Sequence, residues 1–455
     1  MRMRTTPLPI ALLLAAGACS PIPAPGAGPA LALRGCTVPG HAEFVRCGTL
    51  SVPEDPAHPD GRRISLNIVV VPAVAPAPAQ APLYEFAGGP GLAATEGAVF
   101  YLTAGAAHRQ HRDIVLVDQR GTGGSAPLAC PELADERDRP MFRDEEVTAC
   151  HEHLARGADL SQYTTANTVA DLQAVRAALG HGPVDLFGIS YGTRVALAWI
   201  AAEPAAVRSA VLVGTVPDDA RVPLWHARHA QDTLDDVFAD CRADAACTRD
   251  FPTLDADWAT LLARDDFDGP AREAFRGFLQ STPGQRRVPA TIAAMAVAGP
   301  PAPPEGADGP RYFDGLFLSA TCAEDVPWID DDAATDAVRG TFLGDYRIAR
   351  QRAACAIWDV PPRELRYART ASDVPVLFIA GERDYVTPPA WAERVAARFP
   401  RGRLVTVPSL GHFPDGLSNM GCLDAMLLGI AADADLSRLD TRCVATMAPP
   451  PFATR

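Results

Sequence analysis

The sequence predicts an α/β fold in which a mostly parallel sheet is covered by helices on both faces and carries an inserted, mainly helical cap. Three observations predict this fold. Short, unbroken apolar runs that are typical of buried strands recur along the chain and alternate with helical stretches. The strand pattern lapses between residues 217 and 372, where the sequence is helical and polar. The 455 residues suffice for one large core with such an insertion.

The expected strands fall into two groups. Residues 44–52 and 63–71 are expected to pair first, as antiparallel strands. Residues 167–179 place apolar side chains on one face at helical spacing, and they predict a covering helix. The strands expected to follow the antiparallel pair, most of them parallel, are residues 83–86, 114–117, 184–187, 210–213, 374–380 and 404–407.

The N-terminus has the features of an export signal. Arg2 and Arg4 precede a short apolar stretch, residues 8–16, which is too short to span a bilayer in the mature protein. Cleavage is expected before Cys19, where Ala-Gly-Ala-Cys resembles a bacterial lipobox with Ala16 at the position usually held by Leu. We therefore expect export to the periplasm or cell surface, with lipid on Cys19 as an outer-membrane anchor. Ordinary signal cleavage, which would leave Cys19 as a spare thiol, is the alternative.

The predicted organisation has six segments. We expect the C-terminal segment, from Ala448 onward, to be disordered. The segments are a signal peptide (1–18), a tether rich in Pro, Ala and Gly (19–35), the first part of the α/β core (36–216), the cap (217–372), the second part of the core (373–445) and a tail (446–455).

The cysteine count fits an exported chain. Eleven cysteines become ten when Cys19 is set aside, and an even number in an exported protein indicates disulfides. Sequence does not fix the connectivity, but the spacing suggests that neighbours pair. These pairs are Cys36–Cys47, Cys130–Cys150, Cys241–Cys247, Cys322–Cys355 and Cys422–Cys443.

Composition and charge exclude several classes of function. The chain is 48% hydrophobic and 21% charged, which is ordinary for a globular protein. Its formal net charge of −14 argues against nucleic acid as a partner. The run from His151 to His153 lacks the i, i+4 spacing of a helical zinc pair and a third ligand, so no metal or other cofactor is expected. The sequence does not indicate an oligomeric state.

Residues 188–192 form a G-x-S-x-G pentapeptide with Ser190 at its centre. A strand is expected directly before it and a helix directly after it, which is the context of a nucleophile elbow. Small flanking residues allow a sharp turn that exposes the serine hydroxyl above a helix N-terminus, where positive partial charge favours a developing anion. A glycine-rich turn with an incidental serine is the alternative interpretation.

The order of residues along the chain predicts the partners of Ser190. Elbow hydrolases place the serine first, then an acid, then a histidine. His412 follows a predicted strand, whereas His226 and His229 lie in a polar helical stretch. Asp384, in the loop after the strand at 374–380, is the expected acid, and Glu382 is the second choice. Such a triad would activate the serine hydroxyl, which is otherwise a weak nucleophile.

A tetrahedral oxyanion also needs preorganised hydrogen-bond donors. The backbone N–H of Tyr191, directly after the serine, is one expected donor. The glycine cluster at 88–91 follows the strand at 83–86, and we expect the N–H of Gly89 to be the other donor. A simple tight turn is the alternative interpretation, and a phosphate-binding loop is not expected because no Gly-Lys-Ser/Thr follows.

Together these segments resemble the α/β-hydrolase superfamily, and within it the secreted serine peptidases of the tripeptidyl aminopeptidase and proline iminopeptidase group. The resemblance runs from about Cys36 to the C-terminus and is least distinctive in the middle. Ala87 departs from the pattern, since many members carry His there. The segments that carry the resemblance are residues 47–55, the loop at 88–91, D-Q-R-G-x-G-x-S at 118–125, the elbow at 188–192, and the loops at 384–388 and 411–413.

The resemblance implies an aminopeptidase that releases residues or short peptides from substrates with a free N-terminus. Such an enzyme needs an anionic group for the substrate ammonium. Glu324 and Asp325 resemble the acidic cap segment that has this role in the iminopeptidase branch, although a solvated acidic loop is an equal alternative. An esterase or lipase on the same fold is the second functional hypothesis, because the same triad serves both reactions.

Overall fold

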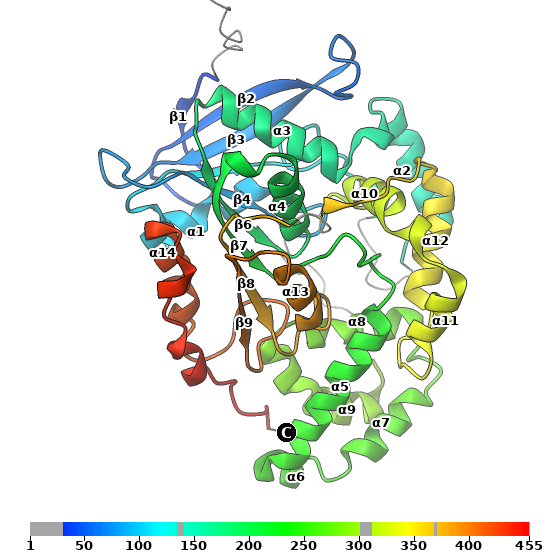
Figure 1. Ribbon diagram of the computed structural model, residues 1–455. Coiled ribbons are helices and arrows are strands. Elements are labelled where there is room, and N and C mark those ends of the chain that lie inside the picture. Colours follow the sequence, from blue (N-terminus) through cyan, green and yellow to red (C-terminus); the bar gives the residue numbers. More distant parts are fainter. Residues whose placement is uncertain (1–30, 134–140, 301–311, 368–370, 455) are drawn as a thin grey trace, which may run out of the picture.

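The computed structural model describes residues 31–133, 141–300, 312–367 and 371–454 (Figure 1). The predicted signal peptide, Cys19 and most of the predicted tether therefore lie outside the described residues. Within the described ranges, no helix has both the length and the apolar character needed to cross a membrane.

The described strands form one nine-stranded sheet in the order β1-β2-β3-β5-β4-β6-β7-β8-β9. The strands from β1 to β3 are antiparallel to their neighbours, and all pairs from β5 through β9 are parallel. This confirms the predicted α/β fold with a mostly parallel sheet. The strands are β1 (Arg34–Cys36), β2 (Val45–Pro53), β3 (Arg63–Val71), β4 (Leu83–Phe86), β5 (Ile114–Val117), β6 (Val184–Ile189), β7 (Val207–Val213), β8 (Val376–Gly381) and β9 (Arg403–Val407).

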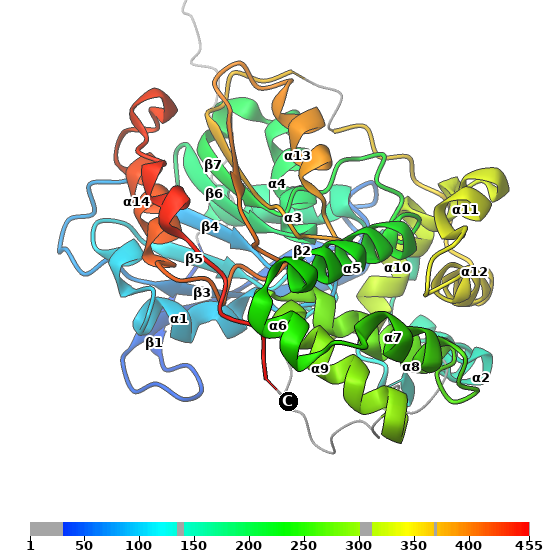
Figure 2. The same cartoon turned by 90° about the horizontal axis from the view of Figure 1, so that it is seen from below.

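Helices cover both faces of the sheet (Figures 1 and 2). Alternate residues of one strand face opposite sides, so Leu212 of β7 packs in one apolar cluster and Val213 in another. The first cluster contains side chains of α3 (Thr165–Ala178), α4 (Tyr191–Ala202) and α13 (Pro389–Ala396). The opposite face is covered by α1 (Ala98–Leu102) and α14 (Gly421–Asp433).

The segment between β7 and β8 contains helices and loops but no strand in its described part, and it lies to one side of the sheet (Figures 1 and 2). It has apolar cores of its own. One is rich in aromatic rings, including Trp258 and Phe275, and another joins this segment to α2 (Asp144–Ala155). Its helices are α5 (His226–Ala243), α6 (Ala245–Asp250), α7 (Leu254–Leu262), α8 (Gly269–Arg276), α9 (Thr282–Ala298), α10 (Asp314–Glu324), α11 (Asp331–Val338) and α12 (Tyr346–Trp358).

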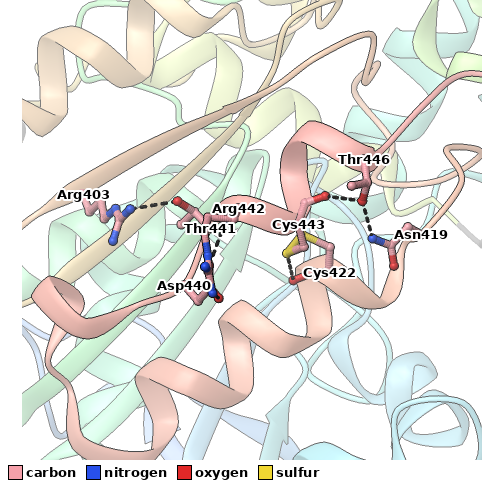
Figure 3. Close-up of a disulfide and its surroundings, with 8 residues drawn as sticks. All are labelled: Arg403, Asn419, Cys422, Asp440, Thr441, Arg442, Cys443 and Thr446. Atoms are coloured by element: carbon pink, nitrogen blue, oxygen red, sulfur yellow. Dashed lines mark hydrogen bonds and ion pairs between the residues drawn. A yellow bond between two sulfur atoms is a disulfide. The ribbon is translucent and has the colours of Figure 1, made fainter.

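Five disulfides cross-link the fold, and they are the five neighbour pairs that the spacing suggests. Cys36–Cys47 ties β1 to β2, and Cys322–Cys355 ties α10 to α12. Figure 3 shows Cys422–Cys443, which joins α14 to the 3-10 helix Arg442–Thr446. Each disulfide thus connects segments that also pack against each other.

Two expectations about the chain ends need correction. β1 begins at Arg34, so the last residues of the predicted tether belong to the sheet. The predicted disorder from Ala448 onward is wrong. Phe452 is only 9% exposed, the guanidinium of Arg286 lies 4.4 Å from its ring centroid, and the N–H of Ala453 donates to the Arg286 carbonyl. The Phe452 ring packs against Arg286 of α9. The composition of the tail does not indicate this contact.

Candidate active site

Ser190 lies at a sharp turn between β6 and α4. Its φ of 53° and ψ of −123° are rare for a residue with a side chain, and such strain is concentrated at functional sites. The flanking positions require glycine because neighbouring backbone atoms leave no room for a Cβ atom. A Cβ at Gly188 would lie 2.6 Å from the Gly192 carbonyl oxygen, and one at Gly192 would lie 2.0 Å from that of Phe86. The turn therefore has the geometry that the pentapeptide predicts.

Ser190, His412 and Asp384 form a continuous hydrogen-bonded series. His412 Nε2 lies 3.1 Å from Ser190 Oγ, and His412 Nδ1 lies 2.9 Å from Asp384 Oδ2. In the tautomer with its proton on Nδ1, the imidazole can accept the serine proton on Nε2. These are three residues from three separate loops, at the carboxyl ends of β6, β8 and β9.

The loop after β8 holds the carboxylate of Asp384, which is 3% exposed. The N–H groups of Val386 and Thr387 donate to its Oδ1, and the Thr387 hydroxyl donates to its Oδ2 at 2.6 Å. Glu382, the second choice for the acid, instead accepts a hydrogen bond from the N–H of Ser409. The structure thus brings Asp384, and not Glu382, to the histidine.

The glycine loop after β4 runs beside Ser190. A Cβ at Gly88 would lie 3.4 Å from the Cβ of Ser190. Gly89 has a φ of +114°, and a Cβ there would lie 2.5 Å from the Gly91 nitrogen, so this turn requires glycine. Tyr191 is the first residue of α4, which places its N–H at a helix N-terminus next to the serine. The glycine loop and the N-terminus of α4 therefore both lie next to Ser190.

The D-Q-R-G-x-G-x-S segment braces the loops around this site. Asp118 accepts hydrogen bonds from Asn67, from the N–H and hydroxyl of Thr95, and from the N–H of Gly124. Arg120 is fully buried and forms a two-pronged ion pair with Asp171. Their contacts are structural.

A cavity of about 430 Å³ opens above Ser190. The glycine loop, Tyr191, Thr387 and His412 line it from the sheet side, and side chains of the segment between β7 and β8 line much of the rest. A hydroxyl and an imidazole therefore face a cavity large enough for part of a peptide.

Glu324 and Asp325 are both buried, at the end of α10. Asp325 lines the cavity, and Arg194 binds both of its oxygens at 2.8 Å. Glu324 accepts the N–H and the hydroxyl of Thr165, each at 2.7 Å, and lies 3.6 Å from Arg194. Burial raises the pKa of Glu324 to about 7, against the opposing effect of Arg194. The two acids therefore belong to an internal ion-pair network at the edge of the cavity.

Among the polar residues of the cavity lining that sequence reasoning missed, four come from α5, α8 and α12. They are His226, Arg276, Arg347 and Gln351. The fold brings these three helices together. The i, i+4 spacing of Arg347 and Gln351 puts both on one helix face, but such spacing is frequent in an arginine-rich chain and does not indicate a cavity.

The histidines at 151 and 153 have other partners. His151 packs edge-on against Trp358, and His153 lies 3.3 Å from Glu132. In the part of the chain that the structure describes, no three His, Cys, Asp or Glu side chains are grouped so that they could hold a metal ion.

Comparisons with known proteins find a matching family model and several similar proteins. A family model described as alpha/beta hydrolase fold matches residues 86–414. The chain is 27% identical over 445 residues to serine protease Hip1 of Mycobacterium tuberculosis, covering 82% of each protein. It is 27% identical over 438 residues to tripeptidyl aminopeptidase of Streptomyces coelicolor, covering 82% of this chain and 79% of that protein. The solved proline iminopeptidase of Mycobacterium smegmatis is 17% identical, with a TM-score of 0.44 over 86% of this chain and 99% of its own.

The family match covers well over half of the chain and includes the glycine loop, the Ser190 turn, Asp384 and His412. The resemblance to secreted aminopeptidases that the sequence motifs indicate is matched by relatives named as serine protease and tripeptidyl aminopeptidase. The protein belongs to the alpha/beta hydrolase fold family.

Proposed function

We propose that this protein is an exported serine hydrolase, and specifically an aminopeptidase that releases N-terminal residues or short peptides through an acyl-enzyme on Ser190. The observation that carries the proposal is the hydrogen-bonded series from Asp384 through His412 to Ser190 at the floor of a cavity. Relatives named serine protease and tripeptidyl aminopeptidase support peptides as the substrate class.

In the proposed reaction, Ser190 Oγ attacks the substrate carbonyl carbon while His412 Nε2 takes the hydroxyl proton. Asp384 holds the imidazole in position and stabilises its positive charge. The backbone N–H groups of Gly89 and Tyr191 stabilise the negative oxygen of the tetrahedral intermediate. His412 then gives the proton to the departing amine, and a water molecule hydrolyses the acyl-enzyme in the reverse sequence of steps.

The free N-terminus of the substrate is proposed to bind near Glu324 and Asp325. Arg194 already neutralises one negative charge there, because it pairs with both oxygens of Asp325. The ionised form of Glu324 would supply the remaining negative charge, and its pKa of about 7 places that ionisation near neutral pH. Amine recognition by these acids should therefore strengthen as the pH rises through 7.

Export is proposed from the sequence of the N-terminus and is supported by five disulfides, which persist in oxidising compartments. Lipid attachment to Cys19 would anchor the mature chain to a membrane. Fractionation of expressing cells tests the anchor: wild type should sediment with membranes and Cys19→Ser should not. Equal distribution of the two proteins would contradict lipidation.

Two matched substrates test the activity. One is an alanyl or prolyl peptide nitroanilide with a free amine, and the other is the same peptide with its amine acetylated. Cleavage of the free-amine substrate only, with loss of activity in Ser190→Ala, is the expected result. Ser190-dependent hydrolysis of a simple aryl ester without any peptide cleavage would instead establish the esterase alternative.

A further inference from the structure

The part of the cavity lining formed by α8 and α12 carries more positive than negative charge. Arg276 and Arg347 both line the cavity, and one carboxylate lies between them. Glu273 Oε2 accepts from Arg276 Nε at 2.8 Å and from Arg347 Nη1 at 3.3 Å. Because one carboxylate cannot neutralise two guanidinium groups, this cluster keeps an excess positive charge in a protein whose formal net charge is −14.

The third arginine of the cavity lining does not add to this excess. Arg194 is bound by both oxygens of Asp325, so that pair is neutral by itself. Arg276 also donates a hydrogen bond from Nη1 to the hydroxyl of Tyr385. This partner is uncharged, so it does not neutralise the guanidinium. The positive excess is therefore local to Arg276 and Arg347.

Polar groups beside the two arginines lack protein partners. His226 is 6% exposed and Gln351 is 1% exposed, and both line the cavity. Among the described residues, neither ring nitrogen of His226 and neither amide atom of Gln351 has a hydrogen-bond partner, and Arg347 Nε has none either. Buried groups of this kind are normally paired, so their gathering around one cavity indicates a ligand-binding function.

The charge state of His226 fits an anionic ligand. Burial lowers the pKa of His226 well below its ordinary value, and the neighbouring Arg347 and Arg276 lower it further. The imidazole is therefore neutral at pH 7, and one of its nitrogens carries a proton that it can donate. It adds a directional donor without adding further charge repulsion to the two arginines.

We propose that Arg276, Arg347, His226 and Gln351, together called the arginine wall, bind a carboxylate of the substrate and make this hydrolase selective for substrates that carry one. A guanidinium presents its N–H groups in a planar fork that matches the two oxygens of a carboxylate. The inference rests on the proposed function in taking a peptide as the substrate. The carboxylate is then either an acidic side chain or the free C-terminus of a short peptide.

Binding to the inactive Ser190→Ala protein tests the arginine wall without requiring turnover. Calorimetry would compare tetra-alanine with a free C-terminus against its C-terminal amide, and peptide amides with Glu at each position against the same peptides with Gln. We expect at least one carboxylate peptide to bind about tenfold tighter than its neutral partner, which corresponds to about 1.4 kcal/mol. The free-acid pair and the Glu/Gln pairs distinguish the two sources of the carboxylate.

Substitutions in the Ser190→Ala background locate the effect. Arg347→Met should bring the affinity ratio of carboxylate to neutral peptide close to one, and Arg347→Lys should restore part of it. Arg352→Met is the matched control on the same helix, because Arg352 pairs with the exposed Asp331 and does not line the cavity. It should leave the ratio unchanged. Gln351→Met provides a second variant if Arg347→Met does not fold.

Two outcomes would overturn the inference. One is the absence of any carboxylate preference across all the peptide pairs, with undetectable binding counted as absence. The other is a preference that persists in both Arg347→Met and Gln351→Met. Failure of the wild type to cleave peptides would reject the proposed function, but it would not by itself alter the binding comparison, so the two failures are distinguishable.

Discussion

At the scale of single residues, Asp384 is held in place by several hydrogen bonds. Its carboxylate receives two backbone N–H groups and one hydroxyl besides the imidazole of His412. These bonds fix both carboxylate oxygens before substrate binds. Little further conformational entropy is therefore lost when Asp384 orients His412. The acid is thus a positioning element as well as a negative charge.

Asp384→Asn should lower kcat about 10⁴-fold, because the amide can donate to the imidazole and stabilise the wrong tautomer of His412. Steady-state kinetics on the free-amine nitroanilide measures the effect. Glu382→Gln is the matched control, two residues earlier in the same loop and bonded to Ser409 instead. It should retain kcat within a few fold. A comparable loss in both variants would mean that loop integrity, and not the acid, is being measured.

Glu324 predicts a pH dependence of stability. Burial raises its pKa to about 7 in the folded protein, whereas an ordinary glutamate in the unfolded chain titrates near 4.5. The folded state therefore binds this proton more tightly. Its stabilising contribution is fully present below the ordinary pKa and is lost as the pH rises through 7. Glu324→Gln should raise the melting temperature relative to wild type more at about pH 8 than at about pH 5. Equal shifts at both values would contradict the assignment.

At the scale of elements, the turn between β6 and α4 depends on its glycines. A Cβ at Gly192 would lie 2.0 Å from the carbonyl oxygen of Phe86, which belongs to β4 in the same sheet. Because both partners are backbone of packed elements, neither can move without separating α4 from the sheet. The helix and the serine turn are therefore one rigid unit.

Gly192→Ala should destabilise the fold by several kcal/mol, in the range of overpacked core substitutions, and should abolish activity. Gly421→Ala is the control: it lies at the start of α14, and its added Cβ would contact nothing within 4 Å. That change should be neutral or slightly stabilising, as alanine favours helix over glycine. Urea unfolding followed by circular dichroism compares the two variants. A stable, active Gly192→Ala protein would disprove the close approach between Gly192 and the Phe86 carbonyl oxygen.

The strands and the Ser190 turn could be predicted because their signals are local. Four apolar residues ending at Val117, or a glycine on each side of Ser190, indicate a buried strand or a turn wherever they occur. The arginine wall could not be predicted, since Arg276 and Arg347 are 71 residues apart and meet only after α8 and α12 pack. The ordered conformation of the C-terminal tail likewise depends on a long-range contact, between Phe452 and Arg286 of α9. Long-range packing, unlike periodicity, leaves no local pattern.

At the scale of the whole molecule, the disulfides divide into short and long loops. Cys241–Cys247 spans 6 residues between α5 and α6, and Cys322–Cys355 spans 33 residues between α10 and α12. The second pair connects α10, which ends directly before Asp325, to α12, which carries Arg347. A disulfide that encloses a long loop should restrict the unfolded chain more than one that encloses a short loop.

Removing Cys322–Cys355 by a double serine substitution should cost about 4 kcal/mol, and removing Cys241–Cys247 about 2 kcal/mol, from loop-closure entropy. Guanidinium unfolding of the two variants and of wild type, all under oxidising conditions, gives the three free energies of unfolding. The variant that lacks Cys322–Cys355 should also lose part of its catalytic efficiency, because α10 and α12 both supply cavity residues. The other variant should lose less, since α6 supplies no cavity residue and Cys241 lies at the opposite end of α5 from the cavity residue His226. Equal losses of stability would show that the cross-links act mainly through native-state packing and not through the length of chain that they enclose.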